Sequence, residues 1–490
     1  MVFAELSRTT VAFMATSIAS SAMHQVFNFY YVKVFLDRYH ISEPWFQSAQ
    51  VIYMVWNAVN DPLFGYLQDN AHWACVKSRR HAILYGGPIW ALAFLIPWFP
   101  WVEYEHGSWL CALHLILALS FYDAMFTFVL LAQACLFTEI SSNFKKRVGL
   151  MQCAQIGQLI GSVSVFICEW TSHNLTDYTA FQWTCLFIAC IAGLLLVFTG
   201  KNAHTQYDLN QTALKPKITV DSHTTPMSLE VEVQANSEFM DRSSKQSVWS
   251  LTWQILLQKN FLIFVLINLG QEFHRTFCSN FRGIIMDHLI PAGTIEGTTR
   301  SVLYGSLMFL PPILNIMGGQ VVTRIGAYKV YRMAFIVKIG LGSVMFLIGN
   351  TWMSLLLAFL IIDSVLTSSV TSLMGICLSD IIDDDMAVNK RKHPMSSMVF
   401  GTNALITKPG QSLAPMMTVW ILNMYGYSEL NKEKAMDSIS PVDLEGLHGV
   451  MFNLVCFVPV IIGMLQLSIW SMYGLKRTHE PSIIPKHIDT

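Results

Sequence analysis

The chain has 490 residues, of which 53% are hydrophobic and 13% are charged, and its net charge is -1. Soluble domains carry about twice that charged share, so an ordinary soluble protein is excluded. The charge balance gives no basic surface for nucleic acid, and the 10 cysteines lack the spacing of zinc ligands or of a disulfide framework. We therefore expect a membrane protein with no nucleic-acid partner, no bound metal and no cofactor.

Apolar runs near the length of a membrane-spanning helix recur along the whole chain. They cover residues 10–36, 45–69, 81–100, 108–138, 148–170 and 179–200, and then 258–288, 301–323, 329–349, 352–379, 396–424 and 447–474. Six runs on each side of a polar stretch is the layout of secondary transporters built from two helix bundles. The sequence predicts an all-α membrane protein with a six-helix bundle at 1–200, a flexible cytoplasmic linker at 201–250, a second six-helix bundle at 251–475 and a cytoplasmic tail at 476–490.

The second apolar run contains one acid and two amides. Asn57 and Asp61 are one helical turn apart, and Asn60 directly precedes Asp61. A charge at that depth is costly, so an intramembrane aspartate indicates function. The oxygens of these residues can converge on a small cation such as Na⁺, or one of them can carry a proton. The alternative is a helix kinked at Pro62 whose Asp61 only hydrogen-bonds a neighbouring helix.

Several later runs carry polar side chains on one helical face, which is typical of helices that line a cavity. The candidate cavity residues are Asp123 and Thr127 in the fourth run, Glu272 and Arg275 in the seventh, Thr371 in the tenth, and Asn403 and Lys408 in the eleventh. Two alternatives to a role in a cavity remain open for these residues. Serine and threonine commonly pack between membrane helices, and Glu272 and Arg275 are spaced to pair with each other.

Lysine and arginine concentrate in alternate short loops, which indicates the cytoplasmic side. Basic groups lie within residues 77–80, 145–147, 324–332 and 390–392, whereas residues 101–107 and 171–178 have none. Both termini are therefore expected in the cytoplasm. The sequon at Asn174 is expected outside, where it can carry a glycan, and the membrane is expected to be the plasma membrane.

The end of the second run is a candidate cytoplasmic gate. Gly65 and Asp69 come before Arg79 and Arg80, and a second Gly-x-x-x pattern begins at Gly319, the matching place after the eighth run. Glycine lets helix ends approach closely, and the basic residues can pair with acids. Two such patterns at matched positions also favour a chain of two related halves.

The segment Asn60-Asp61-Pro62-x-x-Gly65-x-x-x-Asp69 resembles the second-span signature of the glycoside-pentoside-hexuronide:cation symporters, the melibiose carrier group of the major facilitator superfamily. The likeness continues in Ser379-Asp380-Ile381-Ile382-Asp383 and in Lys408, and Phe273-His274 is similar to the animal transmembrane protein 180 type. The resemblance implies the twelve-helix fold of that superfamily. It also adds Asp380 and Asp383 to the candidate gate.

By this resemblance the cation site would consist of Asn57, Asn60, Asp61 and Ser120. Sodium-coupled members have two acids where this chain has Asn57 and Asp61. A single carboxylate offsets less of the cost of dehydrating Na⁺, so a proton, or no coupling ion, gains weight. The positions of the sugar-stacking aromatic residues read Thr127 and Thr371, so a galactoside substrate is not expected.

Two functions from different classes follow. The first is a symporter in the lipid bilayer that couples a small polar solute to Na⁺ or H⁺ by alternating access. The second is a membrane receptor or scaffold that keeps the fold without transporting. No nucleophile with its base, and no metal constellation, indicates an enzyme.

Overall fold

The computed structural model describes residues 7–70, 76, 78–105, 107–173, 175–206, 248–284, 297–349, 352–391, 394–426 and 441–475. Within these ranges the regular structure is helical, and no strand is present. The expected glycan acceptor Asn174, most of the expected linker and the whole expected tail lie outside the described residues. The chain divides into two compact units, one of Met1–Phe261 with Ile382–Ile406 and one of Leu262–Ile381 with Thr407–Thr490.

The first unit contains six long helices. They are α1 (Arg8–Lys33), α2 (Glu43–Asn70), α3 (Arg79–Leu95), α4 (Trp109–Ile140), α5 (Phe144–Ser172) and α6 (Tyr178–Asn202), followed by the short α9 (Val248–Leu256). Polar residues cap several of them: the Ser7 hydroxyl accepts from the backbone N–H of Thr10, and the Asn143 side chain accepts from those of Lys145 and Lys146. Such caps satisfy N–H groups that have no partner inside the helix.

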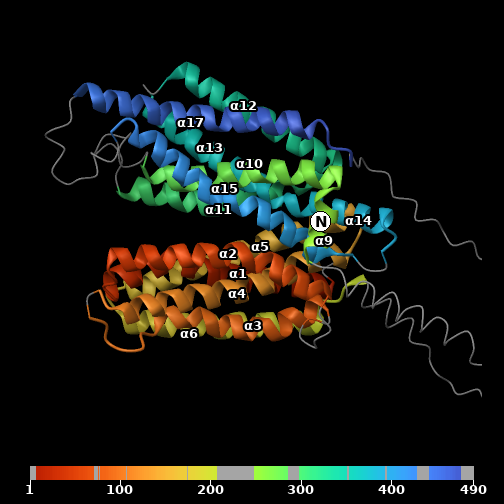
Figure 1. The fold of residues 1–490 in the computed structure, drawn as a ribbon, viewed down its shortest axis with the longest axis horizontal. Coiled ribbons are helices and arrows are strands. Elements are labelled where there is room, and N and C mark those ends of the chain that lie inside the picture. The colour runs from red at the N-terminus through yellow and green to blue at the C-terminus, as the bar shows by residue number, and fades with distance from the viewer. Residues whose placement is uncertain are drawn as a thin grey trace, which may run out of the picture. The chain divides into compact units, whose positions relative to one another are not determined.

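Within the first unit, α1 packs on α5 and α6, α3 on α4 and α6, and α2 on α4 (Figure 1). The approach of α1 to α5 depends on Gly157 and Gly161, one turn apart on α5. A Cβ atom at Gly157 would lie 2.8 Å from the Met14 carbonyl oxygen, and one at Gly161 would lie 2.5 Å from that of Ile18. Small residues at this spacing let membrane helices approach closely.

The second unit is also a bundle of helices. It contains most of α10 (Lys259–Ile284), α11 (Gly297–Ile325), α12 (Ala327–Ile348), α13 (Met353–Ser372) and α17 (Pro441–Trp470). Two helices divide between the units: α14 (Met374–Val388) begins in the second and ends in the first, and α15 (Ser396–Asn423) does the reverse. In the second unit α12 packs on α17 and on α13. Helix α13 also contacts α11.

Every expected apolar run coincides with a long helix, the tenth run with α13 and the start of α14. Among the described residues, eight helical segments are long and apolar enough to cross a membrane. The other expected spans form α1, α2, α10 and α15, which are 26, 28, 26 and 28 residues long and carry more polar residues. Several of the candidate site residues lie on these four helices.

Candidate functional site

A buried polar cluster joins α2 to α4 in the first unit. The Asn60 amide donates hydrogen bonds to the Asp123 carboxylate and, at 3.3 Å, to the Thr127 hydroxyl. Tyr53 donates to the same carboxylate at 3.3 Å. Tyr53 and Asn60 are two turns apart on α2, and Asp123 and Thr127 are one turn apart on α4, so each pair faces the other helix.

This cluster lies deep within the helices. Asp123 is roughly 21 Å along the axis from the start of α4 and roughly 26 Å from its end, at a rise of about 1.5 Å per residue. Its exposed fraction is 5%, and that of Asn60 is 0%. A carboxylate near the middle of a membrane helix is costly, which makes Asp123 a candidate functional residue.

In the structure, the residues predicted for the coupling site lie beside residues predicted for the cavity. Asn60, predicted for the coupling site, contacts Asp123 and Thr127, both predicted for the cavity. Asp61 is buried next to Asn60, while Asn57 and Ser120 are half-buried, Ser120 one turn before Asp123 on α4. The coupling residues are therefore part of the same region as the cavity acid.

The predicted cavity residues Glu272 and Arg275 form an ion pair in the second unit. Their side chains are 2.5 Å apart, which is the alternative that their spacing left open, and Gln411 donates to the same Glu272 oxygen at 2.9 Å. The Thr371 hydroxyl donates to the Thr367 backbone carbonyl at 3.0 Å, a common packing arrangement in membrane helices. Asn403 and Lys408 are half-buried on α15.

The predicted gate is the centre of a buried ionic network in the first unit. Arg79 lies 2.6 Å from Asp69 and 3.0 Å from Glu139, and it donates to the Ser397 hydroxyl at 2.8 Å. Asp69 in turn accepts from the Met398 backbone N–H at 2.7 Å. These contacts attach the start of α15 to the ends of α2, α3 and α4.

A second ionic contact lies beside the first. Two nitrogens of Arg147, at the start of α5, donate to the two oxygens of Asp383 at 2.8 and 3.1 Å. Gly65 lies close to the Ser397 backbone, since a Cβ atom there would be 2.8 Å from that carbonyl oxygen. Of the other predicted gate residues, Arg80 is half-buried on α3 and Asp380 is buried on the part of α14 in the second unit.

Sequence reasoning missed the partners that complete these networks. Glu139, Ser397 and the role of Arg147 follow only from contacts between residues far apart in the chain. In the second unit it also missed a group on three helices, in which His274, Asp363 and Lys338 are buried and Cys278 is half-buried. The sequence did carry a signal for this group, because ionisable residues inside apolar runs are expected to be functional.

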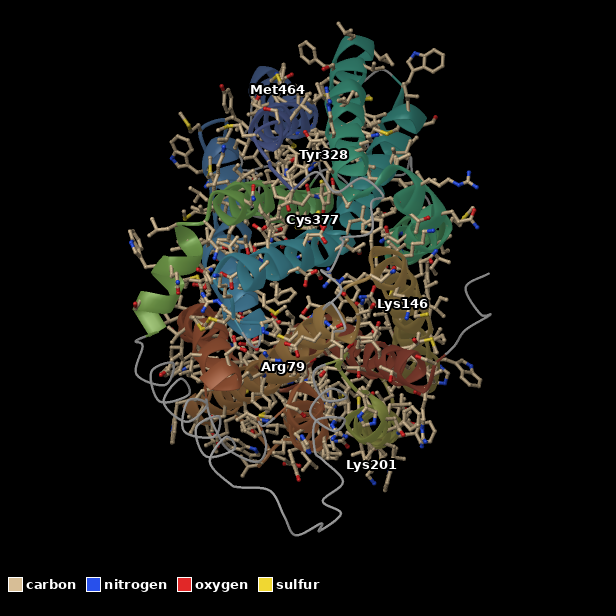
Figure 2. All side chains as sticks on the ribbon, turned by 90° about the vertical axis from the view of Figure 1, so that its right-hand side faces the viewer. Arg79, Lys146, Lys201, Tyr328, Cys377 and Met464 are labelled. Atoms are coloured by element: carbon tan, nitrogen blue, oxygen red, sulfur yellow. The ribbon has the colours of Figure 1, made fainter. Side chains whose placement is uncertain are left out.

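Three basic residues from the predicted cytoplasmic loops lie at ends of first-unit helices, whereas Lys33 and Arg38 lie at the other end, where Arg38 contacts Tyr178. Arg79 begins α3, Lys146 is in the first turn of α5 and Lys201 is in the last turn of α6. All three lie toward the viewer in Figure 2. This arrangement agrees with the loop pattern from which a cytoplasmic side was predicted.

The fold and these sites can now be compared with known proteins. The Major Facilitator Superfamily family matches residues 4–407. The chain is 30% identical to transmembrane protein 180 of Gallus gallus over 488 residues, which cover 95% of this chain and 92% of that protein. It is 28% identical to transmembrane protein 180 of Mus musculus over 493 residues, with the same coverage.

Solved structures share the fold at low sequence identity. The proton:xylose symporter XylE has a TM-score of 0.61 at 11% identity and covers 95% of each chain. A bacterial homologue of the iron transporter ferroportin has a TM-score of 0.59 at 14% identity, covering 96% of this chain and 99% of its own. The fucose:proton symporter of E. coli has a TM-score of 0.56 at 12% identity, covering 93% and 98%.

The chain is therefore a multi-pass membrane protein and belongs to the Major Facilitator Superfamily. The predicted fold class and the predicted likeness to transmembrane protein 180 are confirmed. Membership of the melibiose carrier group stays a prediction.

Proposed function

We propose that this protein is a secondary transporter that couples the movement of a small polar solute to a proton. The observation that supports this most is the Asp123 carboxylate, which is buried at mid-membrane depth between Asn60 and Tyr53. Two of the proteins with the same fold are named as proton symporters of xylose and fucose.

The two acids have different roles in the proposal. Asp123 accepts hydrogen bonds, so hydroxyl or amino groups of a polar solute can replace its bonds from Asn60 and Tyr53. Asp61 is the coupling acid, and it follows Asn60 on α2, so that a change in the bonds of Asn60 alters the surroundings of Asp61. Protonation removes the charge that is costly to move across a low-dielectric membrane.

A proton suits this site better than Na⁺. Within this turn of α2 only Asp61 supplies negative charge, and the Asn60 amide faces Asp123 as a donor, where a metal cation would need oxygen atoms. One carboxylate is enough for a proton. Restoring a second acid by Asn57→Asp is expected to create or strengthen a response to Na⁺.

The ionic network around Arg79 is proposed as the gate of this transporter. In the first unit it holds the start of α15 against α2, α3 and α4 through Asp69, Glu139 and Ser397. Alternating access requires such contacts to form and break as the bundles rock about the solute site.

A thermal-shift screen tests transport against the receptor or scaffold alternative. Purified full-length protein is melted with xylose, fucose and other monosaccharides, and with amino acids, at pH 5.5 to 8. A solute that binds the folded state stabilises it by mass action and so raises the melting temperature. At a solute concentration a hundred times Kd, the free energy of unfolding rises by about 2.7 kcal/mol. We expect at least one polar solute to stabilise the wild type and to stabilise Asp123→Asn less. A panel with no effect would support the scaffold.

A further inference from the structure

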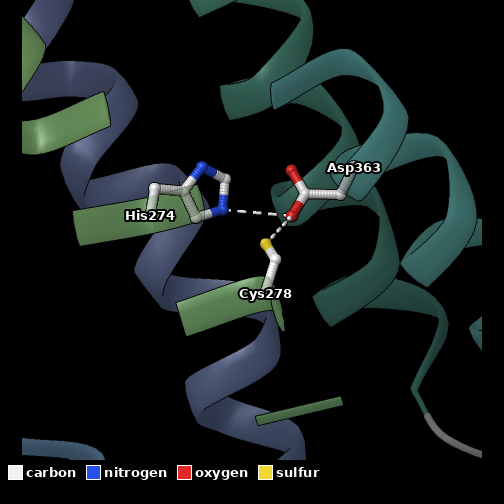
Figure 3. Close-up of side chains that lie close together, drawn as sticks. All are labelled: His274, Cys278 and Asp363. Atoms are coloured by element: carbon white, nitrogen blue, oxygen red, sulfur yellow. Dashed lines mark hydrogen bonds and ion pairs between the residues drawn. The ribbon is translucent and has the colours of Figure 1, made fainter. Parts of the chain in front are cut away.

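Three side chains with metal-binding atoms converge inside the second unit. His274 and Cys278 lie one turn apart on α10, and Asp363 lies on α13. His274 Nε2 is 3.0 Å from Asp363 Oδ2, and Cys278 Sγ is 3.2 Å from the same oxygen. Figure 3 shows the three side chains pointing toward one another from their two helices.

The distances are close to those of a metal site. One ligand atom from each residue lies within 4.8 Å of the other two. Tetrahedral bonds of about 2.0–2.3 Å place ligand atoms roughly 3.3–3.6 Å apart, so shifts of well under about 1 Å are needed for the two close pairs. A nitrogen, a thiolate and a carboxylate oxygen form a donor set typical of Zn²⁺ and its neighbours in the first transition row.

The histidine is oriented as metal-bound histidines are. Its Nδ1 lies 3.1 Å from the Thr367 hydroxyl, which directs Nε2 toward Asp363. Nε2 itself lies against Asp363 in an ion pair, and Asp363 Oδ1 has no hydrogen-bond partner among the described residues. Metal-binding histidines commonly bond through the second ring nitrogen in this way.

Because both side chains are buried, the Asp363 oxygen without a hydrogen-bond partner indicates that something binds there. The exposed fractions are 0% for His274 and 5% for Asp363. His274 lies roughly 22 Å along α10 from its start, and Asp363 roughly 15 Å along α13, so both lie at membrane depth. Buried polar atoms without partners are rare and costly unless something binds them.

Charge limits the kind of ion. Lys338 is buried in the same unit and donates to Gln271 and Gln466 at 3.2 and 3.1 Å, which adds one positive charge to the region. A cation can bind there only if its ligands supply negative charge. Asp363 supplies one, and Cys278 supplies a second when its thiol loses a proton to solvent, so the two ligands match the charge of a divalent ion and the charge of Lys338 remains in addition.

We propose that His274, Cys278 and Asp363 bind a divalent transition metal ion of the Zn²⁺ type and thereby link α10 to α13. The site has three protein ligands, so a fourth position is available to water. The proposal does not rest on the transport function, because it concerns binding alone. The cysteine spacing in the sequence did not indicate it, since Asp363 is 85 residues from Cys278.

Cobalt is the probe for this site, because a cysteine thiolate bound to Co²⁺ gives a charge-transfer absorption that oxygen and nitrogen ligands do not. Co²⁺ is added to purified full-length protein after treatment with a chelator. We expect the band to appear with one equivalent of Co²⁺ and to disappear when Zn²⁺ replaces it. Cys278→Ser should remove the band, and His274→Gln and Asp363→Asn should weaken binding by more than the ~10–100-fold that loss of a hydrogen-bond partner of a metal ligand typically costs.

Cys377→Ser is the matched control, because Cys377 is also buried in the second unit but is not part of the cluster. Its titration should equal that of the wild type. A readout on the wild type alone avoids variants that fail to fold: Zn²⁺ should protect Cys278 from maleimide labelling, as located by peptide mass spectrometry. No cobalt band in the wild type, an undiminished band in Cys278→Ser, or labelling of Cys278 unaffected by Zn²⁺ would overturn the proposal.

Discussion

Arg79 contacts several polar residues of the first unit. Its guanidinium group lies within 3.0 Å of two acids, Asp69 and Glu139, and its side chain is 10% exposed. One cation between two carboxylates offsets part of the cost of burying their charge. A buried ion pair adds little stability compared with apolar residues, but loss of one partner leaves buried charge uncompensated.

Arg79→Met is therefore expected to destabilise the protein strongly. The loss leaves Asp69 and Glu139 without their cation and should lower the free energy of unfolding by about 3–5 kcal/mol, measured by thermal or denaturant unfolding in detergent. Lys145→Met is the control, since Lys145 is exposed and its loss should have little effect. Equal stability of Arg79→Met and the control would show that the network does not hold this part of the protein together.

At the residue scale, the sequence singled out charged side chains that the structure buries, but it did not predict their partners. Asp61, Asp69, Arg79 and Asp123 were singled out because charge inside or beside apolar runs is costly. Their partners could not be predicted, because the distances along the chain are large: 63 residues separate Asn60 from Asp123. The group around Asp363 was missed for the same reason.

At the scale of helices, the contact of α1 with α5 is made by two glycines. Gly161 allows the closest approach, with the Ile18 carbonyl oxygen 2.5 Å from where a Cβ atom would lie. Gly149 lies on the same helix with no atom within 4 Å of that position. The two glycines therefore separate the effect of close packing from the effect of glycine on the helix itself.

Gly161→Ala and Gly149→Ala are expected to change stability in opposite directions. The first inserts a methyl group into a filled contact and should destabilise the protein by about 1–3 kcal/mol. The second adds a better helix former in open space and should stabilise it by up to about 1 kcal/mol. Melting temperatures of the two purified variants test this, and a stabilising effect of Gly161→Ala would mean that α1 and α5 are not in close contact.

The helices were predicted more completely than their ends. Length and apolar composition were enough to place each expected span, because the bilayer imposes both. The predicted tenth run ended at residue 379, whereas α13 ends at Ser372 and α14 continues to Val388. That extension is polar, with Asp383 and Asp385 held by Arg147 and Arg391, and these contacts cannot be predicted from hydropathy.

At the scale of the whole molecule, the orientation in the membrane is a prediction that can be tested directly. Alternate basic loops predict that Asn174 is outside and that a second sequon, Asn210-Gln211-Thr212 in the predicted linker, is inside. We expect glycosidase treatment of protein made in animal cells to shift the wild-type band on a gel and to leave Asn174→Gln unshifted. Loss of the shift in Asn210→Gln instead would mean that the orientation is inverted.

The central claim is that Asp61 couples a proton to the solute that stabilises the protein in the thermal-shift screen. Uptake is measured in proteoliposomes with and without an inward proton gradient, together with exchange of labelled for unlabelled solute at equal pH. Asp61→Asn should retain exchange and lose accumulation, because the amide cannot release a proton. Glu169→Gln, which removes an exposed carboxylate near the end of α5, should behave as the wild type. Gradient-driven accumulation that is unchanged in well-folded Asp61→Asn would contradict the account.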